Sequence, residues 1–86
     1  MWKIVLSSKA KKQSKAALNS SYRETIERLM KIIAVNPFQN PPPYEKLEPP
    51  TDNSYSRRIN RQHRLVYKVY VREKVIKILA FLTHYE

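Results

Sequence analysis

Residues 55–82 read YSRRINRQHRLVYKVYVREKVIKILAFL and contain three runs rich in β-branched and aromatic residues. Such runs, bounded by polar residues, are typical of β-strands. Two polar segments separate them, Arg61-Gln62-His63 and Arg72-Glu73-Lys74. Connections this short join antiparallel neighbours, because a parallel pair needs a long crossover. The pattern predicts antiparallel strands at residues 55–60, 64–71 and 75–82.

Alternation along the middle strand separates two sets of side chains. The set expected to face the core is Leu65, Tyr67, Val69 and Val71. The set expected to form a working surface is Arg64, Val66, Lys68 and Tyr70. The apolar set of the last strand is Ile76, Ile78, Ala80 and Leu82. Strict alternation then carries His84 to the core side, away from Arg64, so either a bulge or terminal turn breaks the pleat after Leu82 or the assignment of faces is wrong.

The first half of the chain predicts one strand and two helices. Residues 2–6 form a β-type run, after which Ser7 or Ser8 can cap a helix that continues to about Asn19. A second helix is expected to begin at the capping box Ser21-Tyr22-Arg23-Glu24 and to end at Asn36-Pro37. Its apolar residues recur at helical spacing: Tyr22, Ile26, Leu29, Met30 and Ile33. Residues 37–53 are rich in proline and predict a stiff, irregular loop.

This order of elements predicts an α+β fold with a short N-terminal strand and two helices packed on one face of a small antiparallel sheet. At 86 residues the chain is expected to be a single domain, residues 1–86. The other face of the sheet is then available for a ligand.

The composition favours an anionic partner. The 17 Lys and Arg residues exceed the 7 Asp and Glu residues, which gives a net charge of +10 and predicts binding of nucleic acid or of an acidic protein. Without glycine the chain has no Gly-rich phosphate loop, and without cysteine it has no disulfide framework or thiolate metal site. Two histidines alone make no convincing metal centre, so neither a metal nor another cofactor is expected. No apolar run approaches the ~20 residues of a membrane span, and the N-terminus lacks a signal-peptide pattern, so we expect a soluble protein.

The residue types near the C-terminus suit cleavage of RNA. The 2′-hydroxyl of RNA is a nucleophile within the substrate, so cleavage needs a base, an acid for the departing 5′-oxygen, and cations for the charge on phosphorus. Glu45 in the stiff loop, His84 and Arg64 are the natural candidates, with Arg58 as a second cation.

Several motifs then carry a resemblance to a known family. They are Asn36-Pro37-Phe38, Glu45-x-Leu47, Tyr55-Ser56-Arg57-Arg58-Ile59, His63-Arg64-Leu65-Val66-Tyr67 and the closing His84-Tyr85. Together they resemble the YoeB/Txe toxins of the RelE superfamily over essentially the whole chain.

The resemblance implies a RelE-like fold and a bacterial, cytoplasmic toxin that enters the ribosomal A site and cuts the mRNA there without a metal. By position, it implies Glu45 as general base, His84 as general acid, Arg64 as the phosphate-binding arginine and Tyr85 as the residue that organises the site. The side chains expected to contact RNA are Arg58, Arg57, Tyr55 and Lys46.

The same resemblance implies partners besides mRNA and the ribosome. A cognate YefM/Phd-type antitoxin is expected to wrap the toxin with an acidic segment, and operator DNA is expected to bind only through that complex. A homodimer is possible, and neither supported nor excluded by the sequence.

The chain also departs from the family. Prolines stand before Glu45 where relatives often carry glycines, Tyr55 stands at a position that is commonly Trp or Phe, and Glu86 follows the terminal His-Tyr. A carboxylate at Glu86 could keep His84 protonated, or it could pair with Arg64 and compete with phosphate. Two other functions stay open: a ParE-like toxin that inhibits gyrase without catalysis, and a basic RNA-binding module that does not cleave.

Overall fold

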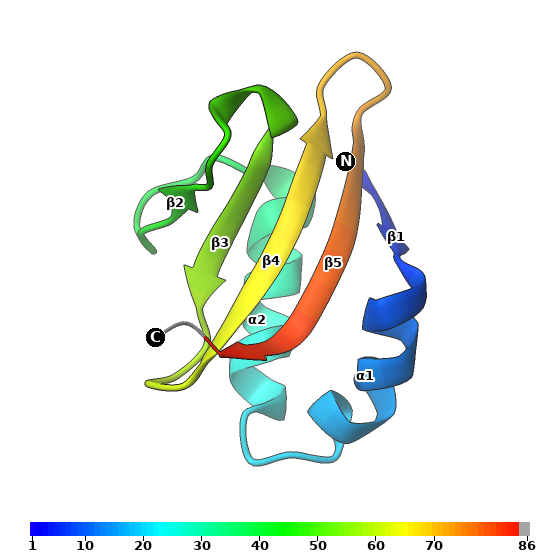
Figure 1. The fold of residues 1–86 in the computed structure, drawn as a ribbon, viewed down its shortest axis with the longest axis vertical. Helices are drawn as coiled ribbons and strands as arrows, with labels where there is room; N and C mark the ends of the chain where they lie inside the picture. The colour runs from blue at the N-terminus through cyan, green and yellow to red at the C-terminus, as the bar shows by residue number, and fades with distance from the viewer. Residues whose placement is uncertain (85–86) are drawn as a thin grey trace.

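The computed structural model describes the backbone of residues 1–84 and the side chains of residues 1–81. Five strands form one sheet in the order β1-β5-β4-β3-β2. The elements in chain order are β1 (Lys3–Leu6), α1 (Ser8–Leu18), α2 (Arg23–Val35), β2 (Glu45–Lys46), a short 3-10 helix (Pro50–Asp52), β3 (Ser54–Arg58), β4 (His63–Tyr70) and β5 (Val75–His84). Figure 1 views the sheet with α2 behind it and α1 beside β1 and β5. The predicted α+β fold, with helices on one face of the sheet, is confirmed.

The sheet is mixed and not purely antiparallel. Strands β3, β4 and β5 are antiparallel neighbours as predicted, but β1 runs parallel to β5, with Lys3 opposite Val75. The direction of β1 depends on where the two helices return the chain, which no local pattern encodes. Strand β2 was not predicted, because two residues are too few to show alternation, and it pairs antiparallel with β3.

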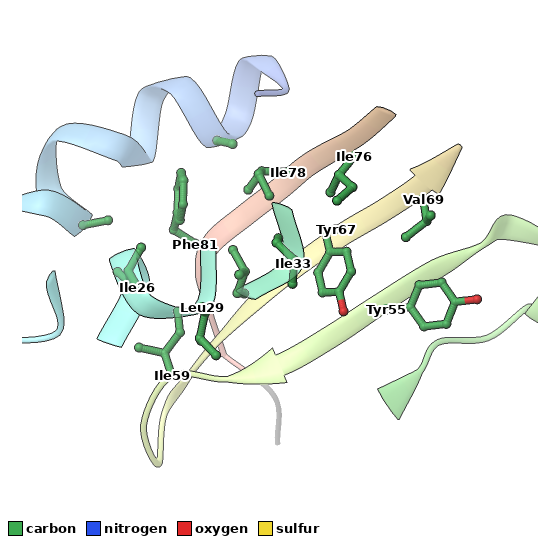
Figure 2. Close-up of a cluster of buried hydrophobic side chains, with 13 residues drawn as sticks. Ile26, Leu29, Ile33, Tyr55, Ile59, Tyr67, Val69, Ile76, Ile78 and Phe81 are labelled. Atoms are coloured by element: carbon green, nitrogen blue, oxygen red, sulfur yellow. The ribbon is translucent and has the colours of Figure 1, made fainter. Parts of the chain in front are cut away.

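The core lies between the sheet and the helices (Figure 2). Leu65, Tyr67 and Val69 are buried as predicted, and they pack with Ile76 and Ile78 of β5. Helix α2 contributes the side chains of Ile26, Leu29 and Ile33. Burial of each large apolar side chain stabilises the fold by about 1.5–3 kcal/mol.

Val71, also predicted to be buried, is 60% exposed. It lies in the turn after β4, where the pleat has ended and alternation no longer determines the face.

The register of β5 shifts twice against β4. Tyr67 is opposite Ile78, but Val66 is opposite Ala80 and Arg64 is opposite Thr83. Because directly opposed residues share a face, Ala80 lies on the face away from the helices, and Phe81 joins the core in its place. The expected break in the pleat is present, but it begins before Ala80 and not after Leu82.

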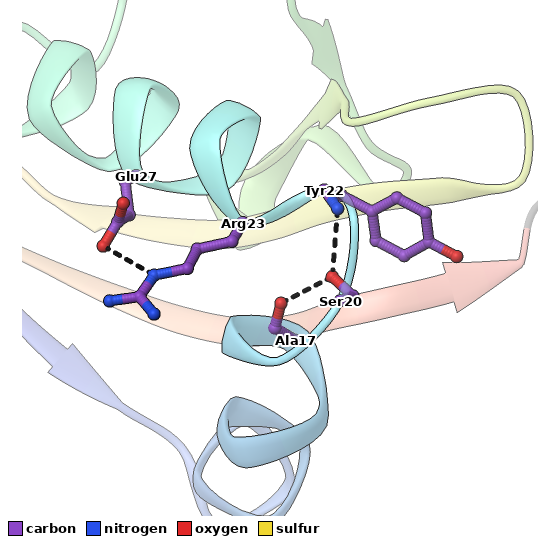
Figure 3. Close-up of polar contacts among 5 residues, drawn as sticks. All are labelled: Ala17, Ser20, Tyr22, Arg23 and Glu27. Carbon is purple, nitrogen blue, oxygen red and sulfur yellow. Dashed lines mark hydrogen bonds and ion pairs between the residues drawn. The ribbon is translucent and has the colours of Figure 1, made fainter.

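One predicted helix start is confirmed and the other is wrong. Ser7 caps α1, since its Oγ accepts a hydrogen bond from the Ala10 amide at 3.1 Å. Helix α2 begins at Arg23 with Tyr22 as N-cap and without a side-chain cap. Ser20 instead closes the turn, because its Oγ donates to the Ala17 carbonyl at 2.6 Å and accepts from the Tyr22 amide at 3.2 Å (Figure 3). Asn36 ends α2 in an extended conformation, as the following proline predicted.

The first turns of α2 carry an ion pair on their exposed side. Arg23 Nε lies 3.4 Å from Glu27 Oε2, one helical turn along (Figure 3). Such an exposed pair adds a few tenths of a kcal/mol, roughly, to helix stability.

In the part of the chain that the structure describes, no helix combines the length and the apolar character that crossing a bilayer requires.

Candidate active site

We call the sheet face opposite the helices the outer face. Two cross-strand pairs place polar side chains on it: Glu45 opposite Ser56, and Arg58 opposite Arg64. These residues surround a cleft of about 230 Å³, lined by Pro43, Tyr44, Glu45, Ser56, Arg58 and Arg64. The fold therefore brings together three predicted site residues, Glu45, Arg58 and Arg64, from three neighbouring strands.

Arg64 is the central cation of the cleft. Its side chain is 18% exposed, and its Nη1 donates to Glu45 Oε1 at 3.2 Å and to Ser56 Oγ at 3.4 Å. The Glu45 side chain is 67% exposed, so water competes for its oxygens and the pair contributes little stability. A stronger anionic ligand can therefore replace the carboxylate on Arg64.

Arg58 lies directly across the sheet from Arg64 and is exposed. Opposed residues of an antiparallel pair have Cβ atoms about 4.5–5.5 Å apart, and like charges at that distance repel each other. An anion bound between them would relieve the repulsion. The pair thus has the charge to hold a phosphate.

Arg57 lies on the opposite face and is 1% exposed. Its Nε donates to Tyr67 Oη at 3.0 Å, and its Nη atoms donate to the carbonyls of Pro42 at 2.6 Å, Gln39 at 2.8 Å and Pro37 at 3.0 Å. This placement contradicts the predicted RNA contact of Arg57. The guanidinium instead holds the proline-rich loop that leads to Glu45.

Tyr67 completes this anchor of the loop. Its Oη donates to the Pro37 carbonyl at 2.9 Å. Burial raises the pKa of Tyr67, and the positive charge and hydrogen bond of Arg57 oppose that rise only in part. The phenol therefore keeps its proton and remains a hydrogen-bond donor.

Tyr55 and Lys46 occupy the helix side of β3 and β2. Tyr55 is buried, with its ring against Phe38, Tyr44 and Tyr67, so the ring is not available to stack on a base as predicted. Lys46 is exposed, and its Nζ lies 3.3 Å from the Tyr55 hydroxyl. Of these two residues, only Lys46 is exposed, and its RNA contact stays a prediction.

The predicted roles of His84 and Tyr85 fall on side chains that lie outside the described residues. The backbone register alone places His84 opposite His63 and Thr83 opposite Arg64. His63 is half-buried, and its ring centroid lies 5.2 Å from that of Tyr22.

Two residues of the cleft were not assigned a role from the sequence. Ser56 is buried at its floor and bonds Arg64, and Tyr44 lies on its wall. Alternation along β3 could have indicated Ser56, since it shares a face with Arg58. Nothing local indicates Tyr44, because the path of the loop places it.

Comparison with known proteins gives a consistent result. The family model of YoeB-like toxins of bacterial type II toxin-antitoxin systems matches residues 13–85. The YoeB toxin in the heterotetrameric YoeB–YefM complex of Staphylococcus aureus is 33% identical, with a TM-score of 0.79 and 99% of each chain covered. A YoeB dimer from the same organism is 32% identical, with a TM-score of 0.79 and 98% of each chain covered.

A more distant structure shares the fold. The intact RelBE toxin-antitoxin complex of Escherichia coli includes a chain that is 16% identical, with a TM-score of 0.75 over all of both chains. A search of curated proteins gave no match. The family match over most of the chain and the similarity to the Staphylococcus toxin lead to one conclusion: this chain belongs to the YoeB-like toxins of bacterial type II toxin-antitoxin systems.

Proposed function

We propose that the chain is a ribosome-dependent endoribonuclease that cuts mRNA in the A site and so inhibits translation. The observation that carries the proposal is the cleft in which Glu45 lies 3.2 Å from Arg64, with Arg58 across the sheet, in a chain of this family. A carboxylate beside two arginines provides a proton acceptor next to a phosphate site.

The proposed reaction uses the RNA's own nucleophile. Glu45 accepts the proton of the 2′-hydroxyl as its oxygen attacks the adjacent phosphorus, and Arg64 and Arg58 compensate the charge that builds on the phosphorane oxygens. His84 gives a proton to the 5′-oxygen as the P–O bond breaks, and Tyr85 organises the site; both roles rest on the family resemblance. The products are a 2′,3′-cyclic phosphate, or the 3′-phosphate formed by its opening, and a 5′-hydroxyl. No metal is needed for this sequence of proton transfers.

Substrate binding would exchange the partners of Arg64. In the free chain Glu45 occupies Nη1 of Arg64, whereas a bound phosphate would take that position through charge-assisted hydrogen bonds. The exchange frees the Glu45 carboxylate to act as the base. The ion pair is therefore the resting form of the site. Because the Glu45 side chain is exposed, the free-energy cost of the exchange is small.

The partners follow from the same proposal. Arg58, which lines the cleft, and Lys46, which is exposed and follows Glu45 in β2, would contact mRNA. The +10 charge suits an antitoxin of the YefM type that wraps the chain with an acidic segment, and operator DNA would bind only through that complex. The protein would act in the bacterial cytoplasm, either as a monomer or as a homodimer.

The test is primer extension on a defined mRNA in a cell-free translation reaction, repeated on naked RNA. Wild type should produce new 5′ ends at codon positions only when ribosomes are present. Glu45→Gln, Arg64→Ala and His84→Ala should each reduce cleavage about 10²–10⁴-fold. Glu48→Gln is the matched control, because Glu48 is an exposed carboxylate of the same loop outside the cleft, and it should cleave like wild type.

Three outcomes would contradict the proposal. Full activity in all three site variants would refute the mechanism. Inhibited translation with intact mRNA would indicate a binding module that does not cleave. DNA breaks trapped on gyrase would indicate a ParE-like inhibitor.

A further inference from the structure

The outer face carries cations well beyond the cleft. The cross-strand register places Lys68 directly opposite Lys77, and Val5 of β1 lies on the other side of Lys77. Alternation along β4 puts Lys68 and Tyr70 on the same face as Arg64. Among the described residues of the five strands, Glu45 is the one acidic side chain on this face.

Two lysines opposed across a sheet destabilise it, because their charges repel each other at Cβ separations of about 4.5–5.5 Å. Both are half-buried, and among the described side chains neither forms an ion pair with an acid. Lys68 Nζ lies 5.5 Å from the centroid of the Tyr70 ring, a cation–π contact that places charge and aromatic surface together.

A hollow of about 390 Å³ lies beside Lys68 and Tyr70. Arg72 also lines it, as does one acid, Glu73, in the turn after β4. Cations next to an aromatic ring, with space beside them, are the elements with which proteins hold single-stranded nucleic acid: the cations bind phosphates and the ring stacks on a base.

We infer that Lys68, Tyr70 and Lys77 form a second RNA-binding patch, which holds the substrate strand a few nucleotides away from the cleaved phosphate. The inference rests on the proposed nuclease function. Lys68 is four residues from Arg64 along β4, which corresponds to about 13 Å. RNA seated on Arg64 and continuing along the outer face reaches the patch without leaving the sheet. This continuity, with the aromatic ring, favours RNA over an acidic protein as the ligand.

The test measures binding separately from cleavage. The probes are fluorescent RNA oligonucleotides with a 2′-O-methyl group at the cleaved position, one ending at that position and two continuing several nucleotides to its 5′ or 3′ side. The variant is Lys68→Met with Lys77→Met, and the control is Lys11→Met with Lys12→Met, which removes the same charge from the exposed side of α1. Thermal unfolding checks the fold, and the Lys68/Lys77 variant should unfold at the same or a higher temperature because a repulsion is removed.

The Lys68/Lys77 variant should bind one of the extended oligonucleotides about 5- to 30-fold more weakly at low salt, and the truncated one about as tightly as wild type does. The slope of log affinity against log salt for that extended probe should become shallower by about 1.4, which is two contacts at ~0.7 each. The Lys11/Lys12 control should weaken the binding of all probes by a small and equal factor.

Equal effects of the two variants on every probe would overturn the inference, since only the overall field would then matter. Unchanged RNA binding with weakened binding of an acidic peptide would assign the patch to a protein partner instead. In a third outcome, wild type cleaves no RNA while the Lys68/Lys77 substitutions still selectively weaken binding of an extended probe. In that case the inferred patch stands and the proposed nuclease function fails.

Discussion

Replacing Arg57 with Met should lower the stability of the chain sharply, whereas the same change at Arg58 should leave it nearly unchanged. The two arginines are adjacent in β3 but lie on opposite faces. The Arg57 side chain is 1% exposed, whereas Arg58 is exposed to solvent. Arg57→Met keeps much of the side-chain volume but removes four hydrogen bonds, to Tyr67 and to three loop carbonyls.

The magnitude follows from the groups left behind. A buried acceptor without a partner costs about 1–3 kcal/mol. The Pro37 carbonyl keeps the Tyr67 hydroxyl as donor, and the bonds to Gln39 and Pro42 are only partly buried, so water can reach those two carbonyls. Among the described residues this buried cation forms no ion pair with a carboxylate, so its removal offsets part of the loss. We expect a net destabilisation of about 2–4 kcal/mol for Arg57→Met, against less than about 0.5 kcal/mol for Arg58→Met.

Urea unfolding measures the difference, with Trp2 as the fluorescent probe. Trp2 is the only tryptophan of the sequence, and its half-buried side chain packs against the core. With a slope of about 1–1.5 kcal/mol per molar, the expected loss moves the midpoint down by roughly 2 M for Arg57→Met. Both variants are best compared in a Glu45→Gln background, which should limit toxicity during expression.

The two variants should also differ in their kinetic constants for cleavage. Arg57→Met frees the loop that carries Glu45, so kcat should fall while KM changes little. Arg58→Met removes a phosphate contact and part of the compensation of the phosphorane charge, so KM should rise and kcat should fall as well. Equal midpoints for the two variants, or a free energy of unfolding for Arg57→Met within about 0.5 kcal/mol of wild type, would refute the reasoning that the guanidinium holds the loop.

Three further predictions concern stability. Because the pKa of Tyr67 is raised in the fold, the stabilisation it provides is present below the unfolded value near 10 and is lost as pH rises above it; the wild-type stability curve should therefore fall faster than that of Tyr67→Phe between about pH 9 and 11, and parallel curves would contradict this. Ser7→Ala should cost about 1–2 kcal/mol, because Ser7 Oγ caps α1 and also donates to the Leu79 carbonyl, and Ser8→Ala, one residue on, is the control for urea unfolding. Ile78→Ala should cost about 2–5 kcal/mol by opening a cavity in the fully buried centre of β5, whereas Val71→Ala, in an exposed turn, should change the unfolding temperature little.

The sequence by itself determined both long helices, four of the five strands and the α+β class. Alternation in residues 64–71 predicted the buried set Leu65, Tyr67 and Val69, and the proline after Asn36 predicted the end of α2. These features follow from local periodicity and backbone sterics, which short segments carry without help from the rest of the chain. The family motifs likewise indicated Glu45 and Arg64 before any geometry was known.

Only the tertiary structure decided which of two adjacent arginines meets solvent. Arg57 is enclosed because Pro37, Gln39 and Pro42, which lie 15 to 20 residues earlier, turn their carbonyls toward it. The pairing of β1 with β5 and the two register shifts in β5 also depend on partners distant in sequence. Pairing direction, register and the burial of a charge depend on which groups the folded chain brings together, so they cannot be read from the residues that show them.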